Sequence, residues 1–144
     1  MSRPSSSVAP LAARTTLQAV VGVLALVPTL TGLAGILLGP DFLRLDPPWP
    51  VDLDSHFRFL SGVFLRVGIG FYSCIPNIET KTERFRLLGG LIVLGGLARL
   101  WSLLLAGGPS AGHVFGLLME LGVVPLLVLW QGRLAREHDG PEGA

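Results

Sequence analysis

The sequence predicts an all-α integral membrane protein folded as a four-helix bundle, and three observations lead to that fold class. Half of the 144 residues are apolar and only 15% are charged, whereas a soluble domain has about 25% charged residues. The apolar residues gather in four long runs, which together exceed what a soluble domain of this length can bury. Most of the charge lies between the runs. These observations exclude a soluble globular fold.

The four runs predict a single transmembrane domain over residues 15–131, because each is about as long as the 20 residues that a helix needs to cross a bilayer. The first run is too long for the apolar core of a signal peptide. We expect a disordered tail at 1–14 and a polar tail at 132–144. The expected spans are 15–39, 56–78, 87–106 and 113–131.

The segment 40–54 contains four prolines and four aspartates, which predict an irregular external loop. Because acidic residues there attract basic groups at the outer helix ends, we expect the loop to cover the bundle as a lid. Asp54 and Ser55 are typical N-cap residues and predict the start of the second span.

Loop charges predict the orientation. Cytoplasmic loops carry an excess of lysine and arginine. Seven such residues lie in the two tails and in the 79–86 loop, and one, Arg44, lies in the other loops. The pattern predicts that both termini are cytoplasmic (N-in/C-in) in the inner membrane. The seven residues are Arg3, Arg14, Lys81, Arg84, Arg86, Arg133 and Arg136.

Three ionisable residues lie well inside the predicted spans, namely Arg66, Arg99 and Glu120. Counted from the outer helix ends, each is about seven to ten residues deep, so all three are expected at one level. Each lies on a stripe of small and polar residues, and we expect all the stripes to face the inside of the bundle. On the first span that stripe is Gln18, Gly22, Ala25, Thr29 and Gly32. The short turn at 107–112 should bring Arg99 and Glu120 together.

These charges predict a polar cavity that opens outward and binds a small anionic or lipidic molecule, because an unpaired arginine in hydrocarbon is costly. Glu120 is the candidate acid or base. The alternative is a structural pair of Glu120 with Arg99 or Arg66 that fixes only the helix register. The candidate ligand-binding residues are Asp54, His56, Arg58, Arg66, Arg99, His113 and Glu120.

The histidines favour interfacial hydrogen bonding over metal binding, because no spacing typical of a metal site is present. We therefore expect no metal site and no cofactor. The single cysteine, Cys74, excludes an internal disulfide. A net charge of +1 argues against a nucleic-acid partner. The glycine pair Gly35 and Gly39 is spaced as in helix dimers, which leaves a homo-oligomer open.

Three stretches of the chain carry a resemblance to a known family. They are DSHFRFLSGVFLRVGIGFYSCIP, IETKTERFRLLGGLIVLGGLARLWS and LLMELGVVPLLVLWQ. Over residues 15–131 the chain resembles a family of short bacterial four-span membrane proteins catalogued as a domain of unknown function, number 4345. The resemblance implies the fold and a membrane location, and it implies no chemistry. It matches family-typical polar residues at Asp54, His56, Arg58, Glu79, Arg86, Arg99 and Glu120.

Three functional classes remain open at this point. The first is a protein, possibly an enzyme, that binds a lipid or another small anionic molecule. The second is an accessory or scaffold subunit whose buried charges pair with a partner's helix. The third is a small transporter or channel component. Membrane lipids are the partners common to all three, and no phosphate loop, dinucleotide fingerprint or nucleophilic triad motif is present.

Overall fold

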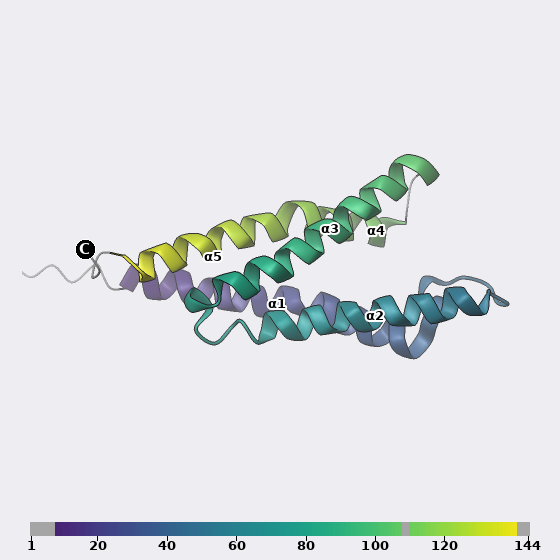
Figure 1. Cartoon of the computed structure of the whole chain (residues 1–144), viewed down its shortest axis with the longest axis horizontal. Coiled ribbons are helices and arrows are strands. Elements are labelled where there is room, and N and C mark those ends of the chain that lie inside the picture. Colours follow the sequence, from purple (N-terminus) through teal and green to yellow (C-terminus); the bar gives the residue numbers. More distant parts are fainter. Residues whose placement is uncertain (1–7, 108–109, 141–144) are drawn as a thin grey trace, which may run out of the picture. The chain divides into compact units, whose positions relative to one another are not determined.

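The computed structural model describes residues 8–107 and 110–140, and all regular structure within them is helical (Figure 1). The α-helices are α1 (Val8–Leu38), α2 (Val51–Tyr72), α3 (Thr82–Ala106), α4 (Ala111–Leu118) and α5 (Val124–His138). A π-helical turn, Met119–Val123, joins α4 to α5. Short 3₁₀ helices cover Gly39–Leu43 and Ile78–Thr80. The all-α prediction is confirmed for the described residues.

Three helical segments are long and apolar enough to cross a membrane, by length and composition. They are Leu11–Leu43, Thr82–Ala106 and Ala111–His138. Helix α2 is not among them, since its first turn carries Asp52 and Asp54 and its interior carries Arg58 and Arg66. A fourth crossing by α2 stays a prediction.

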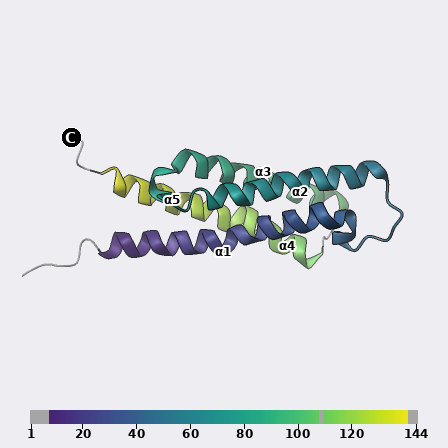
Figure 2. The same cartoon turned by 90° about the horizontal axis from the view of Figure 1, so that it is seen from below.

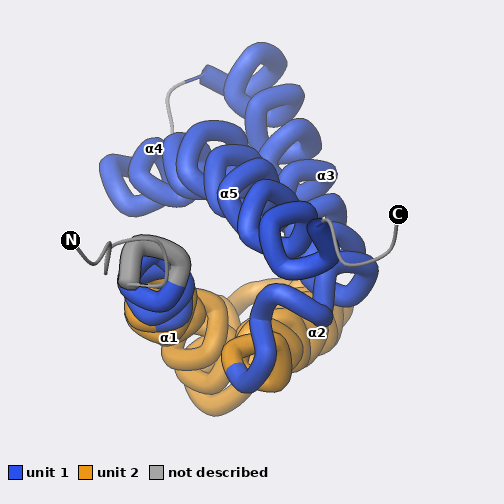
Figure 3. The backbone as a smooth tube through the Cα atoms, turned by 90° about the vertical axis from the view of Figure 1, so that its left-hand side faces the viewer, with its two compact units in different colours: residues 1–18, 76–144 blue, residues 19–75 orange. Residues whose placement is uncertain are grey.

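The chain divides into two compact units (Figure 3). Unit 1 comprises residues 1–18 and 76–144, and unit 2 comprises residues 19–75. Unit 2 is therefore a hairpin made by most of α1 and all of α2. Unit 1 contains the first residues of α1 together with α3, α4 and α5.

In unit 2, α1 and α2 run side by side (Figure 2), and glycines permit their close approach. A Cβ atom on Gly32 would lie 2.6 Å from the backbone nitrogen of Leu65, so only glycine fits there. Farther along the hairpin, the hydroxyl of Tyr72 donates a hydrogen bond to the carbonyl of Gly22 at 3.0 Å. The predicted inward face of α1 is confirmed at Gly22 and Gly32.

The predicted inward face of α2 was wrong. Ser61, Leu65 and Gly68 are among the residues of α2 that contact α1, whereas Arg66 is exposed. The glycine contacts decide which face of α2 is covered, and Arg66 lies off that face. Gly35 is covered by Ser61 and Gly39 lies against Arg58, so this glycine pair serves the hairpin and is not a free dimer face.

The loop between the first two long helices is shorter than predicted. Gly39 has a φ of +63°, a left-handed conformation that ends α1, and a 3₁₀ helix follows at once. Helix α2 starts at Val51 with Pro50 as its N-cap, so the prediction of a cap at Asp54 and Ser55 was wrong. Proline before a helix has the extended conformation that a cap needs, and this lets the helix begin earlier than His56.

The other predicted boundaries were also too narrow. Helix α1 includes residues 8–14 of the expected tail, while residues 1–7 lie outside the described part. Helix α3 includes residues 82–86 of the expected loop, and α5 continues through residues 132–138 of the expected C-terminal tail. Residues 108–109 of the predicted 107–112 turn and residues 141–144 lie outside the described part. Polar residues that follow an apolar run can continue its helix, because helices grow readily once nucleated.

In unit 1, α3 packs against α5 and against the π-helical turn. The side chains of Phe85 and Gln131 are fully buried. Gln131 donates hydrogen bonds of 2.9 Å to the carbonyl of Ile78 and to the hydroxyl of Thr82. The π-helical turn ends just before Pro125. Because proline lacks an N–H group and its ring collides with the carbonyl four residues earlier, an extra residue in the turn relieves the collision.

Candidate functional site

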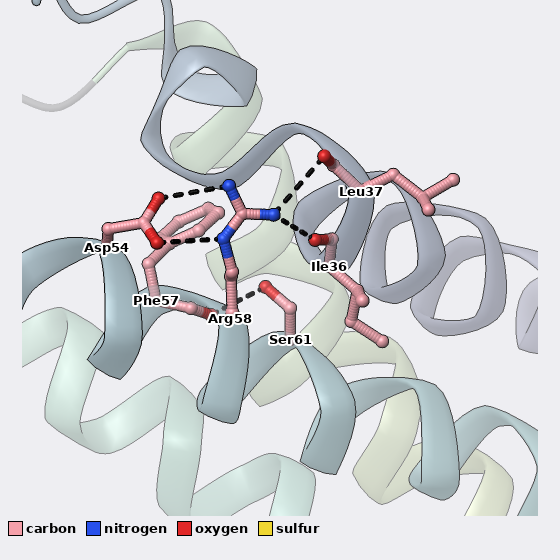
Figure 4. Close-up of polar contacts among 6 residues, drawn as sticks. All are labelled: Ile36, Leu37, Asp54, Phe57, Arg58 and Ser61. Carbon is pink, nitrogen blue, oxygen red and sulfur yellow. Dashed lines mark hydrogen bonds and ion pairs between the residues drawn. The ribbon is translucent and has the colours of Figure 1, made fainter.

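Arg58 is held by both helices of unit 2 (Figure 4). Its guanidinium donates two hydrogen bonds to Asp54, one turn earlier on α2, at 2.9 and 3.1 Å. Its remaining terminal nitrogen, Nη1, donates to the carbonyls of Ile36 and Leu37 in the last turn of α1. The last carbonyls of a helix lack partners within the helix, and a cation is favourable there. Arg58 therefore caps α1 and joins it to α2.

Asp54 is ionised in this arrangement. The hydrogen bonds from Arg58 hold the pKa of the Asp54 carboxyl below its usual value of 3.8, and Trp49 adds a weaker hydrogen bond that acts in the same direction. Asp54 thus belongs to the first turn of α2, and it was wrong to place it in a loop above Arg58. The charges of Asp54 and Arg58 compensate each other locally.

Arg66 has a different environment. It lies two helical turns after Arg58 and is exposed. Within the described part of the chain, no carboxylate or carbonyl group pairs with it. Together with Arg58 it borders an open groove of about 540 Å³, whose other lining residues are Ile36, Phe59, Gly62 and Val63. The groove of unit 2 therefore carries one uncompensated positive charge, that of Arg66, beside apolar side chains.

Unit 1 contains the predicted pair of Arg99 and Glu120, and this contact is confirmed. Arg99 Nε donates to Glu120 Oε2, and Arg99 Nη2 donates to Glu120 Oε1, both at 3.0 Å. This two-point geometry is the strongest form of an arginine–carboxylate interaction. The Glu120 side chain is 9% exposed and that of Arg99 is 33% exposed. The carboxylate is enclosed, whereas one edge of the guanidinium is accessible.

Two glycines make room for this pair. A Cβ atom on Gly96 of α3 would lie 2.8 Å from the Cβ of Glu120, so the backbone of α3 approaches the π-helical turn closely. Gly116 lies one turn before Glu120, and a Cβ atom there would be 3.7 Å from the guanidinium carbon of Arg99. The arginine therefore covers Gly116 while it holds the carboxylate. π-helical turns are frequent at functional sites, and Glu120 lies in one.

The two candidate histidines have separate environments. His56 is exposed on α2. His113 is half-buried near the start of α4, where its Nδ1 and the hydroxyl of Ser110 are 2.8 Å apart. Across residues 8–107 and 110–140, no group of three or more histidine, cysteine, aspartate or glutamate side chains could hold a metal ion.

The predicted site residues fall into separate groups. Asp54, His56, Arg58 and Arg66 belong to unit 2, whereas Arg99, His113 and Glu120 belong to unit 1. Only the pairs Asp54–Arg58 and Arg99–Glu120 are brought into contact.

A third ion pair, between Arg14 and Glu79 at 3.0 Å, was not predicted. It joins the start of α1 to the 3₁₀ helix before α3 within unit 1. The sequence shows the two opposite charges at what were expected to be cytoplasmic helix ends, and that is the signal that could have found the pair.

One comparison with known proteins identifies a family. The model of a family described as a domain of unknown function (DUF4345) matches residues 16–131. The chain belongs to this family. No curated protein and no solved structure matches the chain. The membership confirms the resemblance noted from the sequence.

Proposed function

We propose that this DUF4345 protein is a four-span protein of the cytoplasmic membrane, with both termini inside, that binds an anionic lipid through Arg66. The observation that carries the proposal is the exposed, unpaired guanidinium of Arg66 beside an apolar groove. An arginine within a membrane costs at least about 2.5–3.5 kcal/mol at the helix centre. An anionic head group at the groove offsets that cost.

Three features support the membrane topology. Three helical segments are long and apolar enough to cross. Helix α2 has 22 residues, about 33 Å, so it is long enough to cross a bilayer core while its acidic first turn lies outside that core. The lysines and arginines outside the four apolar runs of the sequence favour one side by seven to one. Epitope insertion near Pro47 should be accessible from outside, and a reporter fused after Gly140 should lie inside. An external reporter at Gly140 would overturn the topology.

The proposed binding is tested by native mass spectrometry of the detergent-purified protein. The wild type should retain an anionic phospholipid, and Arg66→Gln should lose it. Arg133→Gln is the matched control, because Arg133 is exposed on α5 outside the groove. Retention of the same lipid by Arg66→Gln would contradict the proposal. Co-purification of a second membrane protein that depends on Arg66, with no lipid, would instead favour the accessory-subunit function.

We propose no acid–base role for Glu120, because both of its carboxylate oxygens accept hydrogen bonds from Arg99. A bidentate partner leaves neither carboxylate oxygen free to exchange a proton with a ligand. The Arg99–Glu120 pair is therefore given a structural role.

A further inference from the structure

We infer, on the basis of the proposed function, that the ligand is a phospholipid of one net negative charge whose phosphodiester lies against α2 at Gly62. Arg58, Gly62 and Arg66 follow one another at intervals of four residues, which places them along one side of the helix. A Cβ atom on Gly62 would have no other atom within 4 Å. The missing side chain therefore leaves an open notch in the groove between the two arginines.

The side chain of Arg66 is suited to reach this notch. Side chains on an α-helix extend toward its N-terminus, over the preceding turn, and for Arg66 that turn contains Gly62. Arg66 has a planar fork of five N–H donors that matches the oxygens of a phosphate group. Because none of these donors is used within the described part of the chain, the fork is free to hold the phosphate.

Arg58 has a positioning role in this site. Its three nitrogens are occupied by Asp54 and by the carbonyls of Ile36 and Leu37. It therefore forms a fixed outer wall of the notch and contributes no free charge. This leaves Arg66 as the one uncompensated cation of the groove, which matches a phosphodiester with a single negative charge better than a dianionic group.

The depth of Arg66 matches a lipid head group. Its neighbour Leu65 packs on Gly32, which lies about 9 Å, or six residues, before the end of α1. Arginine side chains in membranes extend toward the interface while their stems stay in apolar surroundings. An outward-extended Arg66 thus brings its guanidinium closer to the outer end of the proposed span, where the head groups of the outer leaflet lie. The apolar side chains of Ile36, Phe59 and Val63 line the groove beside it and provide a surface for an acyl chain.

The experiment titrates short-chain phosphatidylglycerol into the detergent-purified protein and measures bound lipid by native mass spectrometry. The variants are Gly62→Leu, which fills the notch, and Gly90→Leu as its control. Gly90 lies on α3, is exposed and likewise has no neighbour within 4 Å of an added Cβ. Both changes raise helix propensity to the same extent, and matching thermal unfolding midpoints verify that both variants fold. We expect about tenfold weaker binding for Gly62→Leu and no change for Gly90→Leu.

A second variant, Arg66→Lys, keeps the charge and removes the planar fork, and it should also bind more weakly. Equal binding of phosphatidylcholine would overturn the charge argument, and full competition by inorganic phosphate would overturn the choice of a lipid. If a fatty acid binds as tightly as phosphatidylglycerol, the site does not select a phosphodiester. If Gly62→Leu binds the lipid with wild-type affinity, the phosphodiester does not lie in the notch at Gly62, although lipid binding through Arg66 would still stand. If wild type binds no anionic lipid, the proposed function itself fails.

Discussion

The two compact units hold their arginines in opposite ways. In unit 1, Arg99 meets a carboxylate from another helix, 21 residues later in the sequence, and the carboxylate is enclosed. In unit 2, Arg58 takes its carboxylate from its own helix, one turn away, and Arg66 has none among residues 8–107 and 110–140. A pair between helices fixes how they pack, whereas a pair within one helix leaves packing to other contacts. The comparison separates a structural charge in unit 1 from an available charge in unit 2.

The largest expected effect is on the pair in unit 1. Arg99→Gln leaves Glu120 as a buried unpaired charge, which should destabilise the protein by about 3–5 kcal/mol. Glu120→Gln should cost less, because Arg99 is 33% exposed and can turn toward a polar environment. The double variant should recover much of the loss. Thermal unfolding in detergent measures this cycle, and additive losses would show that the two residues are not coupled.

The next effect concerns the glycines that bring helices together. Gly32→Ala should destabilise unit 2 by about 1–3 kcal/mol, because the added Cβ would lie 2.6–2.8 Å from backbone atoms of α2, which cannot move independently. Gly96→Ala should cost less, since one of the two atoms at 2.8 Å is the terminal Cδ2 of Leu121, which can move, although the other, Glu120 Cβ, is fixed to the backbone. Unfolding midpoints of both variants test the order, with Gly90→Ala as control. A larger loss for Gly96→Ala would reverse the comparison.

A smaller effect is expected at the end of unit 1 where Arg14 meets Glu79. Arg14→Gln removes the partner of Glu79, whose side chain is 11% exposed, while that of Arg14 is 35% exposed. The expected loss is about 1 kcal/mol, at the upper end of partly exposed pairs. Hydrogen exchange should become faster over residues 11–18 of α1 and remain unchanged in α5. Unchanged exchange in α1 would mean that the pair does not hold the helix start.

The smallest effect is the pH dependence of unit 2. Because the pKa of Asp54 is lowered in the folded state, the pair stabilises the protein above the unfolded value of about 3.8, and the stabilisation is lost as the pH falls through the folded value. The difference in unfolding midpoint between wild type and Asp54→Asn should therefore be present at pH 6 and shrink below about pH 3.8. A difference that is constant across this range would exclude ionic pairing.

Features set by regular helix geometry were predicted correctly from the sequence, whereas the ends of the helices were not. Depth was predictable, because residues count along a helix at a fixed rise, and this placed Arg99 level with Glu120. The inward face of α1 was also predictable, because small residues recur along it. The positions of the helix ends were not predictable. The polar residues at 8–14, 82–86 and 132–138 continue the helices without interrupting their hydrogen bonds.

The amino-acid sequence by itself therefore determined the helical fold, the apolar segments and the contact between Arg99 and Glu120. Only the tertiary structure decided that Arg66 is exposed and unpaired while Arg58 is occupied. The physical reason is that periodicity gives the angle of a residue around its helix but not which angle faces a neighbour. In unit 2 that choice is made by Gly32 and Gly35, whose missing side chains admit the backbone of α2 around Leu65 and the side chain of Ser61.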